Sequence, residues 1–125
     1  MTAPIAIGLV VAGALGAPAR YLLDGFVEDR VAGVFPWGTF VINVSGSLAL
    51  GLITGAALYH AFSNTPKVWL GTGFCGAYTT FSTFTFETVR LLEEGALRTA
   101  FRNALASLLV GTLAAAAGLA IAAAL

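Results

Sequence analysis

The charged residues of this 125-residue chain are confined to three short segments, and this pattern constrains the fold more than any other feature. They lie at residues 20–30, at Lys67 and at residues 87–102, and leave four long stretches without Asp, Glu, Lys or Arg. A helix needs about 20 apolar residues to cross a hydrocarbon layer about 30 Å thick. The spacing therefore predicts four membrane spans with short connections.

The composition favours a membrane protein built from helices. Hydrophobic residues make up 58% of the chain and charged residues 10%, whereas about a quarter of the residues of a soluble domain are charged. Backbone groups in lipid must pair with one another, which favours helices, and the alternation of a membrane β-barrel is absent. We expect an all-α membrane protein with a single transmembrane domain, residues 1–125. The four spans are expected at about residues 3–23, 37–62, 67–92 and 96–125.

The third stretch is unusual for a membrane helix. Residues 71–84 hold three glycines, four threonines, a serine and four aromatic residues, but no leucine. Non-helical backbone at membrane depth is tolerated only inside protein or beside a water-filled cavity, and broken helices present carbonyl groups to ions near the midplane. We therefore predict that the third span is broken near residues 76–80, at the membrane midplane.

No catalytic constellation is visible in the sequence. The chain has one histidine, His60, and one cysteine, Cys75, and no span holds a pair of carboxylates. Neither a metal-ligand cluster nor a nucleophile with a base can be assembled from these residues. The net charge of zero gives no basic surface for nucleic acid. These features indicate a protein that is not an enzyme and does not bind nucleic acid.

Polar side chains recur along one face of the second and fourth spans. Thr39, Asn43 and Ser47 are spaced by four residues, as are Asn103 and Ser107, so each set lies on one helical face. Each stripe is explained by hydrogen bonds between helices, but polar faces on several spans are equally consistent with a pathway for ions. Glycine and alanine pairs with the same spacing predict close helix packing. Examples are Gly51 with Gly55 and Ala114 with Gly118.

The third span adds hydroxyl groups beside two aromatic rings. The hydroxyl residues are Thr79, Thr80, Ser82 and Thr83. Neutral donors of this kind suit a small anion that must leave water without being trapped by a full charge. The edges of the Phe81 and Phe84 rings carry positive potential and can also face an anion, although two phenylalanines in a membrane helix are by themselves ordinary core residues.

Three motifs resemble those of the Fluc (CrcB) fluoride channel family. They are GALGAPARY at residues 13–21, GTFVINVSG at residues 38–46 and GAYTTFSTF at residues 76–84. Their order and the length of the chain agree with that family. The resemblance implies a passive, fluoride-selective channel that exports fluoride across the cell (inner) membrane and so lowers fluoride in the cytoplasm.

The resemblance also implies an assembly and a set of site residues. Subunits would pair as antiparallel, dual-topology dimers with two pores, and a structural sodium ion at the dimer centre would be held by the backbone carbonyls of Gly76 and Thr79. Arg20 would lie in a vestibule and attract anions, or equally would anchor the helix at the interface. The motifs and the polar faces together give the expected pore residues: Thr39, Asn43, Phe81, Ser82, Thr83, Phe84, Asn103 and Ser107.

Two features depart from the family pattern. Ala77 and Tyr78 stand where the family usually has glycine and then leucine or methionine, and Tyr78 adds a hydroxyl without an evident purpose. Arginine also favours one side of the membrane, whereas a dual-topology protein should show little such bias. The five arginines of that side are Arg20, Arg30, Arg90, Arg98 and Arg102. We expect a homodimer, because one chain carries every motif, with a heterodimer with an inverted paralogue as the alternative.

Two other transport functions compete with the fluoride channel. A small four-helix multidrug-type transporter would need a membrane-embedded carboxylate to exchange protons for cationic drugs. Spans one, two and four have none in their interiors, and Glu87 lies toward the end of span three. A less selective anion pore shares all the features above, so only its ion selectivity distinguishes it.

Overall fold

The structure, a computed structural model, describes all residues, 1–125, and is entirely helical apart from short connections. Three helices are long and apolar enough to cross a membrane: α1 (Ala3–Glu28), α2 (Trp37–Tyr59) and α6 (Leu97–Ala124). With 26, 23 and 28 residues, they are about 39, 35 and 42 Å long. Helix α1 continues past residue 23, where the span was expected to end, and Asp24 and Glu28 lie in this extension.

The stretch between α2 and α6 is built from shorter helical pieces. In chain order they are α3 (Asn64–Lys67), the π-helical segment η1 (Val68–Cys75), α4 (Gly76–Tyr78) and α5 (Ser82–Glu93). The first three form one continuous helical run, which ends where Thr79 becomes extended, with φ −79° and ψ 162°. The helical path is therefore interrupted at residues 79–81, and we refer to these three residues as the break.

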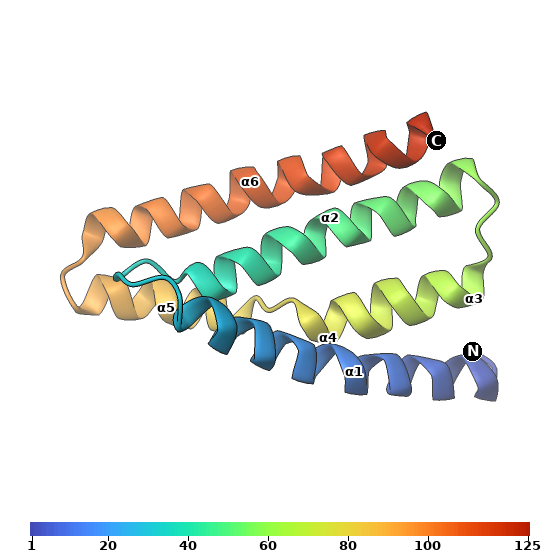
Figure 1. Ribbon diagram of the computed structural model, residues 1–125, viewed down its shortest axis with the longest axis horizontal. Helices are drawn as coiled ribbons and strands as arrows, with labels where there is room; N and C mark the ends of the chain where they lie inside the picture. Colours follow the sequence, from blue (N-terminus) through green and yellow to red (C-terminus); the bar gives the residue numbers. More distant parts are fainter.

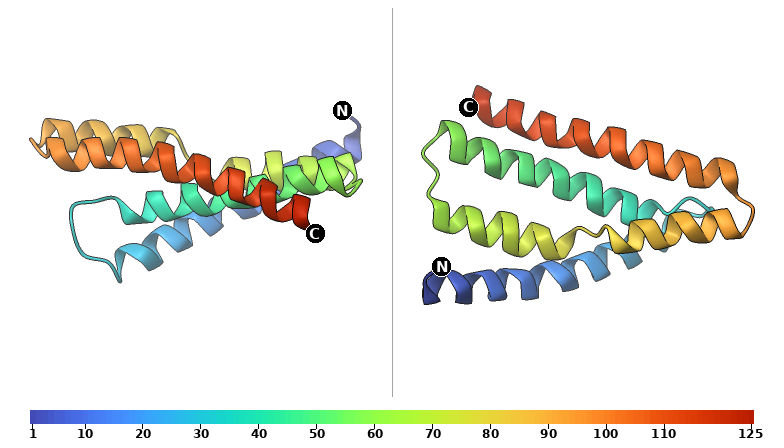
Figure 2. Two further views of the ribbon diagram at one scale, coloured as in Figure 1. Left: turned by 90° about the horizontal axis from the view of Figure 1, so that it is seen from above. Right: turned by 180° about the vertical axis from the view of Figure 1, so that it is seen from behind.

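The long helices lie side by side in a shallow bundle. Figure 1 shows α6, α2, the run from α3 to α4, and α1 in that order, with both chain termini at the end where α3 begins. Helix α5 continues beyond the break toward the opposite end and packs on the first half of α6. Figure 2 shows that this α5–α6 pair diverges from the end of α1 and the start of α2.

Glycines bring the backbones of α2 and α6 into direct contact. A Cβ atom at Gly118 would lie 2.7 Å from the amide nitrogen of Leu52, and one at Gly51 would lie 3.0 Å from the carbonyl carbon of Ala115. Real side chains do not approach backbone so closely, so only glycine fits at either position. Small residues permit this approach where lipid gives no hydrophobic drive between helices. The close packing predicted from the glycine spacing is confirmed for this helix pair.

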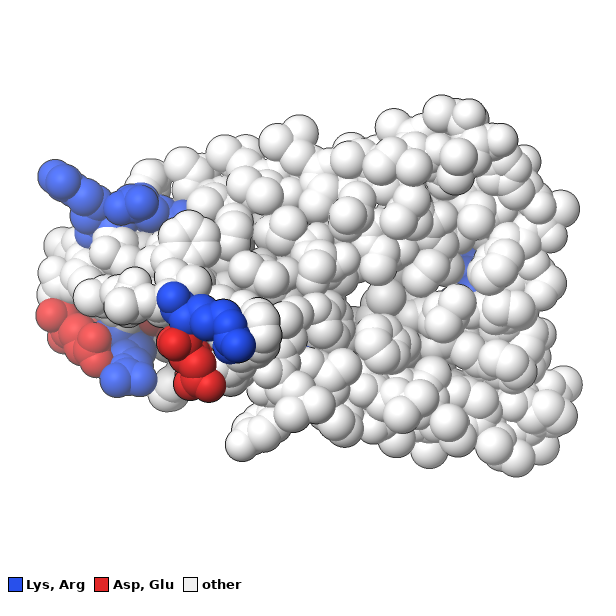
Figure 3. Space-filling model, in the orientation of Figure 1, with Lys and Arg blue, Asp and Glu red and all other residues white.

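Charge is concentrated at one end of the molecule. Figure 3 shows basic and acidic groups gathered at the end where α5 joins α6, while the rest of the visible face is almost free of them. Lys67 is the one charged side chain at the opposite end. Between the two ends the body is almost free of charge, as a hydrocarbon layer requires, because charge within it is costly. The exception is Arg20 of α1, whose guanidinium reaches the break.

Candidate functional site

The side chain of Asn43 in α2 forms hydrogen bonds with both backbone groups of Thr80, the middle residue of the break. The Asn43 Nδ2 donates to the carbonyl oxygen of Thr80 at 2.8 Å, and the Thr80 amide donates to Asn43 Oδ1 at 2.8 Å. A peptide group left unpaired in lipid costs several kcal/mol. The asparagine amide therefore replaces the partners that a continuous helix would have supplied. Both of its hydrogen bonds are made with the backbone of the same chain.

Thr79, the first residue of the break, is held from α1. Arg20 Nη1 donates to the Thr79 carbonyl oxygen at 3.2 Å. The Thr79 amide and hydroxyl both donate to the Cys75 carbonyl at 2.9 Å, and the Thr79 methyl group packs against Gly46 of α2. Arg20 thus acts as a cap for the end of α4, because a basic side chain can satisfy the last carbonyls of a helix. The sequence predicted a vestibule position or an interfacial anchor for Arg20, and neither prediction included this backbone contact.

Thr80 also starts the helix that follows the break. Its Oγ1 accepts the amide of Thr83 at 3.1 Å and lies 3.1 Å from the Thr83 hydroxyl, to which it donates. Phe81 directly precedes α5 and makes no side-chain cap, so the Thr80 hydroxyl instead pairs with an amide of the first turn that has no partner within the helix. The threonine-rich motif therefore encodes both the end of one helix and the start of the next.

The two phenylalanines of the motif are placed differently. Phe81 is 77% exposed, whereas Phe84 is half-buried. Their ring centroids are 5.9 Å apart and their planes are inclined by 47°. Ser82, between them, is exposed, and its hydroxyl makes no hydrogen bond within the chain. Both Phe81 and Ser82 therefore face away from the body of the protein.

A second polar cluster joins α5 to α6. Asn103 is only 1% exposed, and its Nδ2 donates to the Thr88 hydroxyl at 2.9 Å. Thr88 donates in turn to the Phe84 carbonyl at 2.8 Å, and Ser107 donates to Asn103 Oδ1 at 3.4 Å. Thr88 was not among the residues predicted from the sequence. Its position four residues after Phe84 places it on the same helical face, which was the available signal.

Thr39 makes a separate contact with Glu87. The Thr39 side chain is almost fully buried, and its hydroxyl donates to Glu87 Oε1 at 2.5 Å. Glu87 lies four residues after Thr83 and so shares its face of α5. Of the eight expected pore residues, the structure brings Asn43 and Thr83 to the break. It places Asn103 and Ser107 behind Phe84, and Thr39 beside Glu87, while Phe81 and Ser82 face outward.

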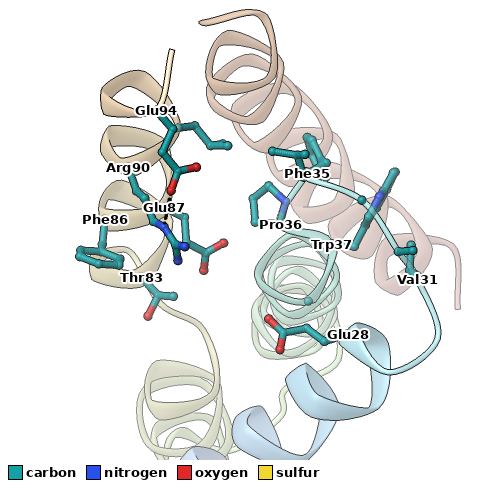
Figure 4. A pocket seen from close by; sticks show the side chains of 15 residues that line it. Glu28, Val31, Phe35, Pro36, Trp37, Thr83, Phe86, Glu87, Arg90 and Glu94 are labelled. Atoms are coloured by element: carbon teal, nitrogen blue, oxygen red, sulfur yellow. Dashed lines mark hydrogen bonds and ion pairs between the residues drawn. The ribbon is translucent and has the colours of Figure 1, made fainter. Parts of the chain in front are cut away.

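Two hollows adjoin this constellation. The larger, about 620 Å³, opens at the charged end between α5 and residues 28–38. Figure 4 shows Glu87 and Arg90 of α5 facing Pro36 and Glu28 across it. The smaller, about 290 Å³, lies at the break and is lined by Asn43, Gly76 and Thr80 among others. Thr83 lines the larger hollow and Thr80 the smaller, so each hollow is lined by one member of this hydrogen-bonded pair.

Only backbone oxygens at the break suit a metal ion. No group of three or more His, Cys, Asp or Glu side chains comes together anywhere in the chain. The Gly76 carbonyl lacks the helical donor it would expect, because the Thr80 amide points to Asn43 instead. Gly76 is exposed, and no atom lies within 4 Å of its Cβ position. Since hard cations prefer oxygen ligands, the freed Gly76 carbonyl fits a sodium ion. The Thr79 carbonyl could contribute only while shared with Arg20.

The fold and this site define a multi-pass helical membrane protein with a polar, hydroxyl-rich interruption in one of its helical segments. The chain belongs to the CrcB family: residues 7–119 match the family described as CrcB-like protein, Camphor Resistance (CrcB).

Three relatives are similar to this chain over most of their length. The chain is 56% identical over 111 residues to fluoride-specific ion channel FluC 1 of Streptomyces avermitilis, covering 88% of this chain and 90% of that protein. It is 49% identical over 124 residues to fluoride-specific ion channel FluC 1 of Frankia casuarinae, covering 91% and 93%. It is 50% identical over 112 residues to fluoride-specific ion channel FluC 2 of Cutibacterium acnes, covering 89% and 91%.

Proposed function

We propose that this protein is a fluoride-selective channel, rather than an enzyme, and that it lets fluoride leave the cell passively across the cell membrane. The observation that carries the proposal is the break, held open by Asn43 beside Phe81 and Phe84, in a chain whose relatives are named fluoride-specific channels.

Passive export is sufficient for fluoride. Hydrogen fluoride is a weak acid that crosses lipid and ionises inside, where the anion is trapped. A membrane potential that is negative inside drives an anion outward by about 2.3 kcal/mol per charge per 100 mV. The channel therefore needs neither a coupling ion nor a proton-exchanging carboxylate in the membrane.

The proposed path runs from the larger hollow along α5 to the break. Thr83 lies in the wall of that hollow, and its hydroxyl is bonded to Thr80 at the second hollow. Phe81 and Phe84 would offer ring edges to the anion, and Ser82 a free hydroxyl. Asn103 and Ser107 of α6 would fix α5 beside the path through the Asn103–Thr88 hydrogen bond. Thr39 of α2 would do the same through its hydrogen bond to Glu87. The proposed role of Asn43 is to shape the path by holding Thr80.

The proposed assembly is an antiparallel homodimer in which each subunit contributes four spans, the third being the broken run from α3 to α5. An unpaired subunit would leave Phe81 exposed together with the freed Gly76 carbonyl. Polar backbone facing lipid is unfavourable, which supports a second subunit over this surface. Inverting one copy would also place a charged end on each side of the membrane. A heterodimer with a paralogue is the alternative assembly.

The proposed sodium ion would lie at the centre of this dimer, held by the Gly76 and Thr79 carbonyls of both subunits. Bound there, it would offset the repulsion between the partial negative charges of carbonyl oxygens that face one another in the low dielectric of the membrane. Arg20, which already bonds the Thr79 carbonyl, would contribute a fixed positive charge close to the same place.

The assignment of the two phenylalanines to the pore is tested by replacing each aromatic ring with an aliphatic side chain. Phe81→Leu and Phe84→Leu are each compared with wild type for fluoride efflux from proteoliposomes. Phe101→Leu is the matched control, because this phenylalanine of α6 is 67% exposed and outside the proposed path. We expect both break variants to lose most of the fluoride flux and the control to keep it. Unchanged flux in both break variants would remove the phenylalanines from the path.

The dual topology of the proposed dimer is tested with a protease-cleavable tag at the C-terminus. Cleavage both in intact spheroplasts and in inverted membrane vesicles would support dual topology. Cleavage from one side only would contradict it and favour a paired paralogue.

A further inference from the structure

The three residues from Tyr78 to Thr80 are each held by a different side chain. Arg20 bonds the Thr79 carbonyl and Asn43 bonds both backbone groups of Thr80. Tyr78, the last residue of α4, is held through its own hydroxyl, which lies 2.8 Å from the Ser45 hydroxyl of α2. This third contact involves the position at which the sequence departs from the family pattern.

The direction of the hydrogen bond follows from the second partner of Ser45. Ser45 Oγ also lies 3.1 Å from the carbonyl oxygen of Ile42, which can only accept. A serine hydroxyl has one proton to donate, so that proton goes to Ile42 and the Tyr78 hydroxyl donates to Ser45. Ser45 therefore keeps a partner when the tyrosine hydroxyl is removed, whereas Tyr78 has no other hydrogen bond within the subunit.

Packing fixes the tyrosine ring as well. The ring stacks on Phe74, one turn earlier, with centroids 5.7 Å apart and planes inclined by 17°. Its Cδ1 lies 3.3 Å from the Cβ position of Gly46, so the ring crosses α2 over a glycine. Around the axis of α2, Asn43 and Ser45 lie about 60° and about 100° to either side of Gly46. The two contacts thus hold the break from both sides of one helix.

We propose that the Tyr78 hydroxyl, acting through Ser45, is a positioning group for the fluoride path. Helix α4 packs mainly on α1, and Asn43 ties the break to α2 on one side of Gly46 only. The Tyr78–Ser45 hydrogen bond ties the end of α4 to α2 on the other side of Gly46 and so helps to set where Thr80 and Phe81 lie. The inference rests on the proposed placement of the path at the break.

The test compares Tyr78→Phe, Ser45→Ala and the double variant in the full chain. Tyr78→Phe removes only the hydroxyl and keeps the stacking on Phe74. Tyr59→Phe and Ser63→Ala are the matched controls, because both residues are exposed and their side chains make no hydrogen bond in the structure. Unitary fluoride current and the fluoride-to-chloride permeability ratio are measured in planar bilayers. Thermal stability is measured in detergent.

We expect each single variant to lower the unitary current or the permeability ratio by roughly two- to tenfold. This is the range that corresponds to the free energy of one neutral hydrogen bond. The double variant should fall no further, because both changes remove the same contact. Ser45→Thr, which keeps the hydroxyl, should retain the wild-type current, as should both controls.

The contrary outcomes are distinct. Wild-type current and selectivity in Tyr78→Phe and Ser45→Ala would overturn the inference, as would a lower melting temperature with both conduction properties unchanged. Deficits that multiply in the double variant would also overturn it. Wild-type fluoride flux in both Phe81→Leu and Phe84→Leu would instead refute the proposed path, whatever the Tyr78 variants do.

Discussion

The contact between α2 and α6 can be tested with a single methyl group. Gly118→Ala would place a Cβ atom 2.7 Å from the amide nitrogen of Leu52 and 3.0 Å from the carbonyl carbon of Gly51. Both are backbone atoms, so no side chain can rotate away and the helices must separate. Overpacking of this kind costs roughly 1–3 kcal/mol, offset by about 1 kcal/mol because alanine is the better helix former.

The matched control removes the helix-propensity contribution. Gly111→Ala lies in the same helix, but its Cβ atom would meet only Ser47 Oγ, at an ordinary 3.8 Å. Both variants gain the same helix propensity, so the difference in unfolding free energy between them isolates the steric cost. We therefore expect Gly118→Ala to be less stable than Gly111→Ala by roughly 1–3 kcal/mol.

The assay is unfolding in detergent, followed by fluoride efflux from proteoliposomes. Because α2 carries Asn43 and α6 carries Asn103, separating the helices should also reduce fluoride flux in Gly118→Ala but not in Gly111→Ala. Equal stability and equal flux in the two variants would refute the direct backbone contact.

Two further substitutions test the polar contacts. Asn43→Asp keeps the shape and can accept the Thr80 amide, but it cannot donate to the Thr80 carbonyl and adds negative charge. We expect fluoride efflux to fall at least tenfold (about 1.4 kcal/mol), with Asn64→Asp, an exposed position, unchanged; normal efflux in Asn43→Asp would contradict the role of the amide. Thr88→Val leaves the buried Asn103 Nδ2 without its partner, which should lower stability by about 1–3 kcal/mol in thermal unfolding. An unchanged melting temperature would show that Asn103 finds another acceptor.

The sequence was sufficient for the coarse architecture. Long uncharged stretches located α1, α2 and α6, because charge in a hydrocarbon layer is costly enough to dominate other preferences. The glycine spacing on α2 and α6 likewise predicted their contact, since only small residues permit such an approach. The C-terminal end of α1 was predicted less accurately, because a helix can continue beyond the lipid into the aqueous phase.

Hydrogen-bond partners were beyond the reach of the sequence. Asn43 was interpreted as a pore-lining amide, yet both of its polar atoms bond the backbone of Thr80. The Tyr78 hydroxyl finds Ser45, 33 positions away in the chain. Such pairings depend on the relative rotation and height of two helices, which helical periodicity along one chain does not specify. The hydrogen bonds of Glu87 with Thr39 and of Thr88 with Asn103 could not be predicted for the same reason.

The most direct test of the account is fluoride efflux from proteoliposomes that contain this purified chain alone, in sodium-containing buffer, with chloride as the comparison anion. The account predicts fast release of fluoride without release of chloride. Release of both anions would contradict fluoride selectivity and indicate a less selective anion pore. No release from correctly inserted protein would contradict a channel formed by this chain alone.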